Sequence, residues 1–240
     1  MKIESEIASG HGLFLALEGI DGAGKSTQAS LLTQQLEALG LSVEVLHEPG
    51  DTVLGEHLRE LLKHDEQAAP THDAELLLFA AARSQLVSQR IKPLLNAGTI
   101  VICDRYIGST LAYQGFGRGL ALERIVAVNQ IATNGLVPNL TILLNITVNA
   151  GLSRKAKRQV EASGGLQIAF DSVAADHSFD RFEDEAVAFQ HRIREGYLAV
   201  AMASLEKYSA GQWVTIDGMK PIHAVAESIW NVVAPLVAKS

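Results

Sequence analysis

The chain has very little cysteine, no excess of positive charge and no long apolar run. Cys103 is the only cysteine among 240 residues, which excludes an internal disulfide and a zinc site made of cysteines. The net charge of −7 argues against a general nucleic-acid-binding protein. No segment approaches the ~18 apolar residues of a membrane span, and residues 1–11 lack the apolar stretch of a signal peptide. We therefore expect a cytoplasmic protein that binds neither nucleic acid nor membranes.

Short apolar runs alternate with helix-length segments along the chain. Most of the short runs are continuously apolar, which is typical of parallel strands covered on both faces. The pattern predicts an α/β fold, a five-stranded parallel sheet with helices on both faces. The predicted strands are Leu13–Glu18, Ser42–His47, Thr99–Cys103, Leu140–Ile146 and Trp213–Ile216; the helical segments include Lys25–Leu39, Asp73–Leu95, Leu120–Thr133, Phe182–Tyr208 and Pro221–Val237. The length suits one domain spanning 1–240 with residues 1–11 as an N-terminal extension.

A phosphate-binding loop follows the first predicted strand. Residues 19–26 match the pattern GxxxxGK[ST] and open an amphipathic helix, so backbone N–H groups and the helix N-terminus converge on phosphates. In this pattern Lys25 reaches the β- and γ-phosphates of a nucleoside triphosphate, and the Ser26 hydroxyl suits Mg²⁺. The residues expected to bind ATP are Gly19, Asp21, Gly22, Ala23, Gly24, Lys25, Ser26 and Thr27.

Two features that other P-loop proteins carry are missing from this sequence, and their absence favours a kinase over a GTPase or a motor. The sequence has no NKxD-like motif, which a guanine-selective GTPase would need. The apolar run Ile100–Cys103 leads to Asp104 and then to Arg105, where a hydrolytic motor would place an acid to activate water. A guanidinium at this position suits a second anion, as the acceptor site of a kinase requires.

Six short motifs in one order resemble the thymidylate kinase family over residues 13–235. They are Gly19–Thr27, Glu48-Pro49-Gly50, Phe79 to Arg83, Asp104-Arg105-Tyr106, Ala112 to Gly119 and Asp180-Arg181-Phe182-Glu183. The resemblance implies a P-loop kinase fold with a helical lid, ATP and thymidine monophosphate (dTMP) as substrates, Mg²⁺ as cofactor and a homodimer.

The resemblance also implies roles for residues on the acceptor side. Arg105 would hold the acceptor phosphate, with Asp104 near Mg²⁺ and the phosphates, and Asp21 would contact the sugar 3′-hydroxyl. Phe79 would stack on thymine while Arg83 hydrogen-bonds its carbonyl edge. Glu48, Thr110, Tyr113 and Gln114 would complete the nucleoside pocket. Taken alone, Phe79 also fits an apolar core stripe, and Glu48-Pro49-Gly50 a structural turn.

A lid is expected at about residues 151–180. Family members take a catalytic arginine either from the P-loop or from the lid, and Gly22 occupies the P-loop position here. Arg154 and Arg158, four residues apart on one helix face, are therefore the expected lid arginines. Residues 159–179 are expected to be an insertion, since the family has a shorter connection there.

Three residues depart from the family pattern near the acceptor: His47, Asp51 and Ala80. Two alternatives to a dTMP kinase stay open. One is another nucleotide or deoxynucleoside kinase, in which Glu48 would be the only obvious base for a neutral hydroxyl. The other is a non-catalytic nucleotide-binding P-loop protein.

Overall fold

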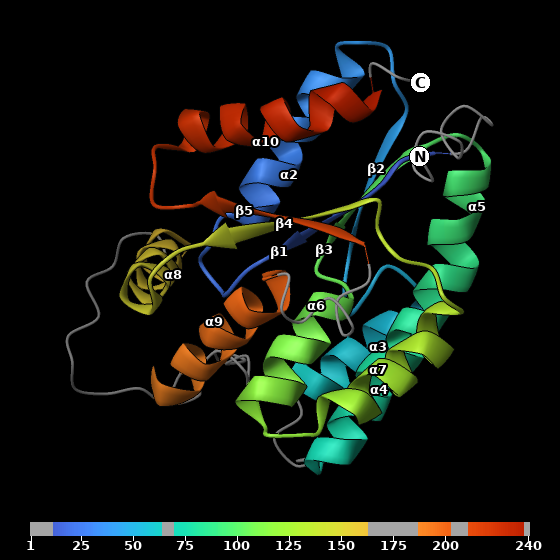
Figure 1. Ribbon diagram of the computed structural model, residues 1–240, viewed down its shortest axis with the longest axis vertical. Coiled ribbons are helices and arrows are strands. Elements are labelled where there is room, and N and C mark those ends of the chain that lie inside the picture. The colour runs from blue at the N-terminus through green and yellow to red at the C-terminus, as the bar shows by residue number, and fades with distance from the viewer. Residues whose placement is uncertain (1–11, 64–69, 163–186, 203–210, 238–240) are drawn as a thin grey trace.

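A computed structural model describes residues 12–63, 70–162, 187–202 and 211–237. Its five strands form one parallel sheet in the order β2-β3-β1-β4-β5 (Figure 1). The strands are β1 Phe14–Glu18, β2 Val43–His47, β3 Ile100–Asp104, β4 Leu140–Asn145 and β5 Gln212–Asp217. The predicted sheet is confirmed, and each strand lies within one residue of its predicted bounds.

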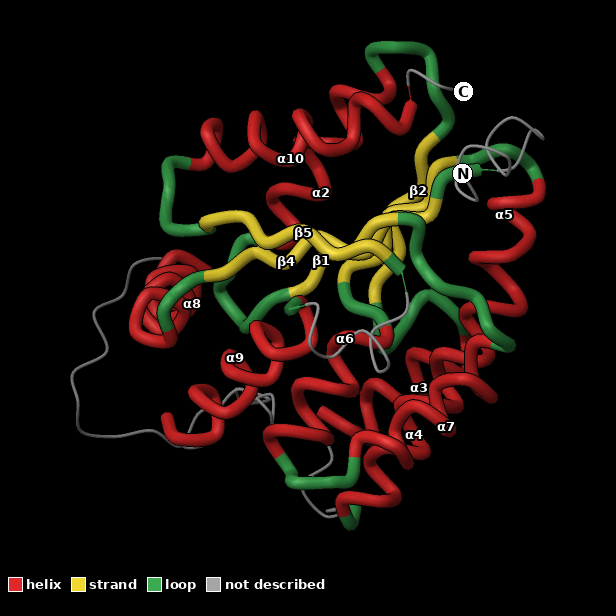
Figure 2. The backbone as a smooth tube through the Cα atoms, viewed as in Figure 1, coloured by secondary structure: helices red, strands yellow, loops and turns green. Residues whose placement is uncertain are grey.

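Helices cover both faces of this sheet, as Figures 1 and 2 show. The long helices α2 and α10 lie on one face, and α4, α5, α7 and α9 lie on the other. The helices are α2 Lys25–Glu37, α3 Val53–Lys63, α4 His72–Leu86, η1 Val87–Ile91, α5 Lys92–Asn96, α6 Ile107–Thr110, η2 Leu111–Gly117, α7 Leu122–Thr133, α8 Val148–Ala162, α9 Val187–Ala201 and α10 Ile222–Val237. None of these described helices combines the length and apolarity needed to cross a membrane.

The three central strands are buried almost throughout. Every residue of β1 is buried, as are all but the last residues of β3 and β4, whereas the edge strands β2 and β5 are partly exposed. Continuous apolar sequence therefore indicates double-sided coverage here, as expected for a parallel sheet between two helical layers.

The segment predicted as one helix over Asp73–Leu95 has three parts. The side chain of Thr71 caps α4 by accepting a hydrogen bond from the Ala74 N–H. The π-helical turn η1 then precedes α5, which has Pro93 in its first turn. Because Pro93 has no N–H to donate to the residue four positions earlier, the α-helical ladder is interrupted there.

Several expectations fall partly outside the described residues. Helix α9 accounts for Val187–Ala201 of the segment predicted as Phe182–Tyr208. Helix α8 forms the described part of the predicted lid, and residues 159–162 of the proposed insertion continue that helix. Residues 163–186, which include the Asp-Arg-Phe-Glu motif, and residues 1–11 lie outside the described parts. Helix α3 was not predicted from the sequence.

The parallel register brings the carboxyl ends of three strands together. Leu17 of β1 pairs with Asp104 of β3, and His47 of β2 pairs with the same Asp104. The residues that follow these strands, Gly19, Glu48 and Arg105, therefore begin at one edge of the sheet, where open α/β sheets bind ligands.

Helix α8 packs against the loop after β1 through two glycines. A Cβ atom on Gly22 would lie 2.8 Å from the Gly151 Cα and closer still to its carbonyl oxygen. A Cβ atom on Gly151 would lie 2.5 Å from the Asp21 carbonyl oxygen. Backbone therefore meets backbone, with no room for a side chain at either position.

We predict that Gly22→Ala destabilises the protein more than Gly40→Ala does. Both glycines have φ of +78°, but a Cβ atom on Gly40 meets nothing within 4 Å. Gly40→Ala should cost about 1 kcal/mol for the left-handed backbone alone. Gly22→Ala should cost about 1–3 kcal/mol more, because α8 must shift. Urea unfolding of both variants measures the difference, and equal losses would contradict the tight contact.

Candidate active site

The loop between β1 and α2 has the geometry expected of a phosphate-binding loop. Helix α2 begins at Lys25, so its N-terminus faces the loop. The buried Lys25 Nζ donates to the carbonyl oxygens of Gly19, at 3.1 Å, and Ile20, at 3.4 Å. Burial lowers the pKa of Lys25 to about 8, and the nearby Arg105 acts in the same direction. A polyanion bound in this loop would stabilise the charged lysine.

The two residues predicted to ligate a metal lie together. The Ser26 Oγ donates to the Asp104 Oδ2 over 2.8 Å, and both residues line the cleft beside the loop. A hydroxyl and a carboxylate are oxygen donors of the kind that Mg²⁺ prefers, alongside water and phosphate oxygens. The two side chains therefore fit Mg²⁺ carried by a nucleoside triphosphate.

A pocket at the carboxyl ends of β1, β2 and β3 contains every residue predicted to bind the acceptor. Ten residues line it: Asp21, Glu48, Pro49, Phe79, Arg83, Arg105, Ser109, Thr110, Tyr113 and Gln114. Phe79 and Arg83 come from α4, whereas Tyr113 and Gln114 come from the π-helical turn η2. The structure thus brings these segments together around one cavity. We call this cavity the acceptor pocket.

Arg83 lies at the inner wall of the acceptor pocket and is only 2% exposed. Its Nε and Nη2 contact the Glu48 carboxylate at 2.8 and 2.6 Å. Its Nη1 donates to the side chains of Thr110 and Asn129, both at 2.7 Å, and Nη2 donates to the Tyr106 carbonyl. Each N–H of Arg83 thus has a protein partner, so a base carbonyl that binds it must share or displace one.

Glu48 and Arg83 form a buried ion pair between β2 and α4. Burial raises the pKa of Glu48, while Arg83 lowers it through charge and hydrogen bonding. The second carboxylate oxygen, Oε1, is buried and has no hydrogen-bond partner among the described residues. The pair therefore ties α4, which carries Phe79, to the loop that begins at Glu48.

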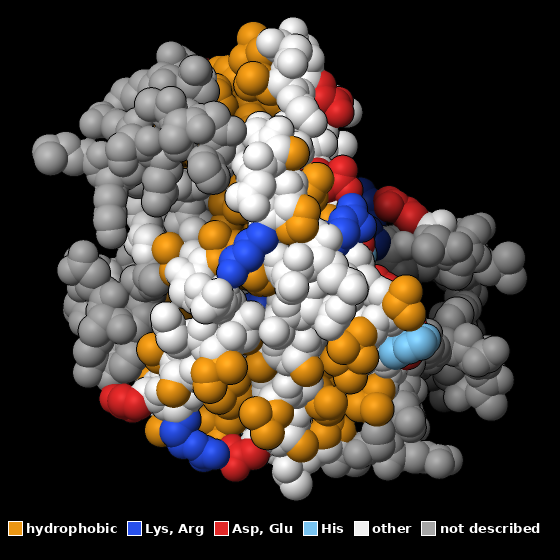
Figure 3. Space-filling model, turned by 90° about the vertical axis from the view of Figure 1, so that its right-hand side faces the viewer, with side chains coloured by type: hydrophobic (Ala, Val, Ile, Leu, Met, Phe, Trp, Pro, Cys, Tyr) orange, Lys and Arg blue, Asp and Glu red, His pale blue; other side chains and the backbone are white. Residues whose placement is uncertain are grey.

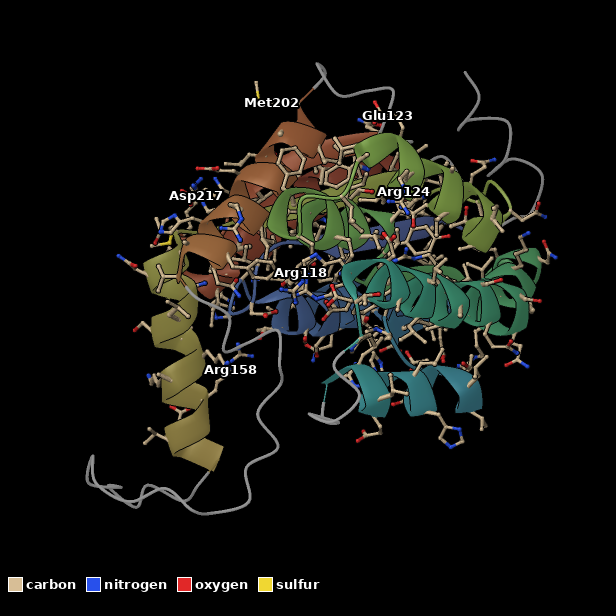
Figure 4. All side chains as sticks on the ribbon, turned by 90° about the horizontal axis from the view of Figure 1, so that it is seen from below. Arg118, Glu123, Arg124, Arg158, Met202 and Asp217 are labelled. Carbon is tan, nitrogen blue, oxygen red and sulfur yellow. The ribbon has the colours of Figure 1, made fainter. Side chains whose placement is uncertain are left out.

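A second buried carboxylate orients the η2 side of the pocket. Glu75, which is fully buried, accepts from the Gln114 Nε2 at 2.8 Å and from two nitrogens of Arg118 at 3.2 Å. Figure 4 shows Arg118 near the centre of the molecule, among the helices. The amide of Gln114 is therefore fixed with its nitrogen toward Glu75.

Arg105 lies where the acceptor pocket meets the cleft beside the P-loop. It has φ of +75°, and its Nη2 pairs with Asp21. Its guanidinium carbon lies 5.2 Å from the ring centre of Tyr113. Burial opposes its charge, but neighbouring groups, including Asp21, raise the pKa of Arg105 well above its usual value. It therefore stays cationic at the junction of the two cavities.

The cleft beside the P-loop, which we call the phosphate cleft, collects positive charge. Its lining includes the cations Lys25, Arg59, Arg105, Lys155 and Arg158. A further cavity between α8 and the start of α10, the donor pocket, shares Gly22, Gly24, Thr27 and Arg158 with it. Shared residues thus place the three cavities next to one another on a chain of net charge −7.

The two predicted lid arginines occupy different positions. Arg158 lines both the phosphate cleft and the donor pocket, and Figure 4 shows it projecting from α8 toward the body of the molecule. Arg154 lines the donor pocket, where it donates to the carbonyl oxygens of Gly22 and Gly218 at 3.4 and 3.0 Å. Arg158 therefore lies at the phosphate cleft, whereas Arg154 joins α8 to the P-loop and to the loop after β5.

The two departures at the rim of the phosphate cleft contact each other. The His47 Nδ1 lies 2.8 Å from the Asp51 Oδ2, and Glu56 lies 3.6 Å from the other ring nitrogen. A hydrogen bond to Asp51 raises the pKa of His47 against the opposing effect of burial. His47 thus lies between a carboxylate of the loop after β2 and one of α3. Ala80, the third departure, is buried on α4.

Several residues of the site were not predicted from the sequence. Ser109 lines the acceptor pocket, and Arg59 and Lys155 line the phosphate cleft. Behind them, Glu18 accepts from the hydroxyls of Ser109 and Tyr197, and Tyr197 accepts from Arg105. One signal was available: Glu18 ends a strand that is otherwise apolar, and a buried charge requires partners.

Comparison with known proteins agrees with this geometry. The family model described as "Thymidylate kinase" matches residues 17–229. A "Thymidylate kinase" of Pelobacter propionicus is 40% identical over 91% of this chain and 92% of its own. Proteins of the same name from Nostoc punctiforme and Thermomicrobium roseum are 42% and 40% identical, over 92% and 94% of this chain and 95% and 96% of theirs. The chain therefore belongs to the thymidylate kinase family.

Proposed function

We propose that the chain transfers the γ-phosphoryl group of ATP to dTMP, giving ADP and thymidine diphosphate. The observation that carries this proposal is that the three cavities adjoin one another. The acceptor pocket and the phosphate cleft share Asp21, Glu48 and Arg105, and the phosphate cleft shares its P-loop wall with the donor pocket. A donor and an acceptor nucleotide can therefore place their phosphates against each other between Lys25 and Arg105.

The transfer needs charge and alignment more than proton transfer. A phosphate oxygen of dTMP forms the new bond to the γ-phosphorus while the bond from that phosphorus to the β–γ bridging oxygen breaks. The acceptor oxygen is already anionic, so no strong base is required, and negative charge leaves on ADP. Lys25, Arg105 and Arg158 would balance the charge on the phosphates.

We assign Mg²⁺ to Ser26 and Asp104, together with the phosphates of ATP. When bound, the ion would neutralise charge on the β- and γ-phosphates. The support is the oxygen chemistry of the two adjacent side chains and their position beside Lys25.

We assign recognition of the acceptor to the lining of its pocket. Phe79 offers a ring for stacking on the base, and Arg83 marks the end of the pocket where a base carbonyl would bind. Arg105 would bind the 5′-phosphate, and Asp21 beside it would contact the 3′-hydroxyl. Thr110, Tyr113 and Gln114 complete the wall around the nucleoside.

Turnover with a panel of acceptors tests the proposal. We expect Mg²⁺- and ATP-dependent ADP release with dTMP, and kcat/KM at least about tenfold lower with dUMP, AMP, CMP and thymidine. Removing Mg²⁺ with EDTA should abolish turnover. The Lys25→Ala variant serves as the inactive control.

Two results would contradict the proposal and indicate another function. Preferred phosphorylation of thymidine would make the chain a deoxynucleoside kinase, with Glu48 as the candidate base. Binding of ATP without turnover on any acceptor would identify a non-catalytic nucleotide-binding protein.

We propose Arg158 as the lid residue that stabilises the transferred group, and Arg154 as a residue that holds α8 near the P-loop. Arg158→Ala should lower kcat by about 100-fold or more while the KM for dTMP changes little, because the charge matters mainly in the transition state. Arg124→Ala is a matched control, since Arg124 is exposed on α7 and pairs only with Asp73 among the contacts described. Equal losses in dTMP binding and in rate would instead assign Arg158 to ground-state recognition.

We also propose a homodimer formed through helices. Large apolar side chains are exposed on α3, α4 and α7, among them Val53, Leu54, Leu77 and Ile131. Figure 3 shows hydrophobic side chains gathered on the lower part of the face that lies to the right in Figure 1. Light scattering should give twice the mass of 25.7 kDa. A monomer at micromolar concentration would exclude this proposal.

A cytoplasmic location is proposed on two grounds. Cys103 is the only cysteine, so the fold contains no internal disulfide and needs no oxidising compartment. The substrates proposed above are intracellular nucleotides. Fractionation of cells that express the full chain tests this location.

A further inference from the structure

Glu18, the last residue of β1, is a carboxylate in the interior of the molecule. It is 0% exposed and accepts four hydrogen bonds. Its Oε1 accepts from the backbone N–H groups of Tyr106, at 2.9 Å, and Ser109, at 3.0 Å. Its Oε2 accepts from the hydroxyls of Ser109, at 2.7 Å, and Tyr197, at 2.9 Å. Burying a charge is costly, and these four hydrogen bonds offset that cost.

The two hydroxyls connect Glu18 to Arg105. The Nη1 of Arg105 donates to the Tyr197 hydroxyl at 3.0 Å and to the Ser109 hydroxyl at 3.3 Å. The same nitrogen also donates to the Gly19 carbonyl at 3.0 Å. Each hydroxyl therefore lies between the carboxylate of Glu18 and the guanidinium of Arg105.

The direction of these hydrogen bonds depends on Glu18. A guanidinium can only donate, so both hydroxyls must present a lone pair to Arg105. Each hydroxyl then has to direct its proton elsewhere. The two hydroxyl oxygens lie 2.8 Å apart, so one of them can donate to the other, and the Oε2 of Glu18 is the carboxylate oxygen within reach of both. A carboxylate that accepts both protons thus leaves two oxygen lone pairs facing Arg105.

We propose that Glu18 is a positioning residue for the acceptor phosphate: its carboxylate orients the hydroxyls of Ser109 and Tyr197 so that they hold the guanidinium of Arg105 where that phosphate binds. The inference rests on the proposed role of Arg105 in binding the phosphate. Glu18 itself lies behind Arg105 and lines neither the acceptor pocket nor the phosphate cleft.

Glu18→Gln changes the hydrogen-bond direction with almost no change in shape. The two backbone N–H groups require an acceptor, so the amide oxygen stays at the Oε1 position and the NH₂ group replaces Oε2. The NH₂ group donates to the hydroxyls, and the two hydroxyls can pass only one proton between themselves. The other proton then points toward Arg105, so the guanidinium loses an acceptor and moves.

Binding of dTMP and of thymidine, measured by calorimetry without ATP, tests the inference. We expect Glu18→Gln to raise the Kd for dTMP by about tenfold or more, the size of a lost hydrogen bond to a charged group. The Kd for thymidine, which has no phosphate, should change less than about threefold, within the uncertainty of a distant contact. Equal weakening of both ligands would mean a general structural role and would overturn the inference.

A double-variant background separates orientation from simple packing. In Ser109→Ala/Tyr197→Phe the hydroxyls are absent, so adding Glu18→Gln should change the dTMP-to-thymidine preference by less than about threefold. A further large loss of preference in this background would overturn the inference. If Glu18→Gln does not fold, Tyr197→Phe alone takes its place, and a smaller but still phosphate-selective loss is expected. An unchanged preference in Tyr197→Phe would then overturn the inference.

Arg105→Ala distinguishes failure of the inference from failure of the proposed site. If Arg105→Ala removes the preference for dTMP over thymidine while Glu18→Gln retains it, Arg105 binds the phosphate without help from Glu18. If Arg105→Ala also retains the preference, the proposed phosphate site is wrong and the inference falls with it.

Discussion

The parallel pairing of β1 with β3 is the constraint on which the site depends. The register sets Leu17 beside Asp104. The two chains then leave the sheet side by side, one as the P-loop and the other as the Asp104-Arg105 turn. Lys25, Ser26, Asp104 and Arg105 consequently meet without any long loop having to be ordered. A shift of this register would separate Ser26 from Asp104, which are joined by a 2.8 Å hydrogen bond.

The interior around this junction is unusually rich in charge for a protein core. Glu18, Glu48 and Glu75 are buried carboxylates, and each is held by an arginine or by groups that contact one. Breaking such a pair is costly because the remaining charge stays buried. The benefit is orientation: each carboxylate fixes a side chain of the acceptor pocket, Arg105 in one case, Arg83 and Gln114 in the others. Glu48 also lines the pocket, whereas Glu18 and Glu75 hold its side chains from behind.

The sequence predicted the frame of the molecule better than its internal contacts. Strand bounds followed from apolar runs because both faces of the sheet are covered, and the P-loop followed from glycine and lysine at fixed spacing. The residues of the acceptor pocket were found through resemblance to a family, since Phe79 looks like a core residue by periodicity alone. The partners of Arg83 could not be predicted in the same way. Asn129 and Thr110 lie on other helices, and only the packing of α4 against them decides which acceptors Arg83 finds.

The limits of local pattern are also visible within helices. The run from Asp73 to Leu95 has the composition of one helix, but Pro93 removes a backbone donor and forces a π-helical turn. Glu18 was read as the end of a strand, whereas its importance comes from Ser109 and Tyr197, which are distant in sequence. Long-range hydrogen bonds of this kind leave no periodic trace.

The contact between Gly22 and Gly151 has a consequence for how such a site can change in evolution. An arginine at position 22 would have to enter space filled by the backbone of α8 and to adopt a left-handed conformation. A side chain at either glycine would meet backbone atoms of the other segment, and a second substitution cannot make backbone atoms smaller. A cation at position 22 of the P-loop would therefore require α8 to move away from the loop.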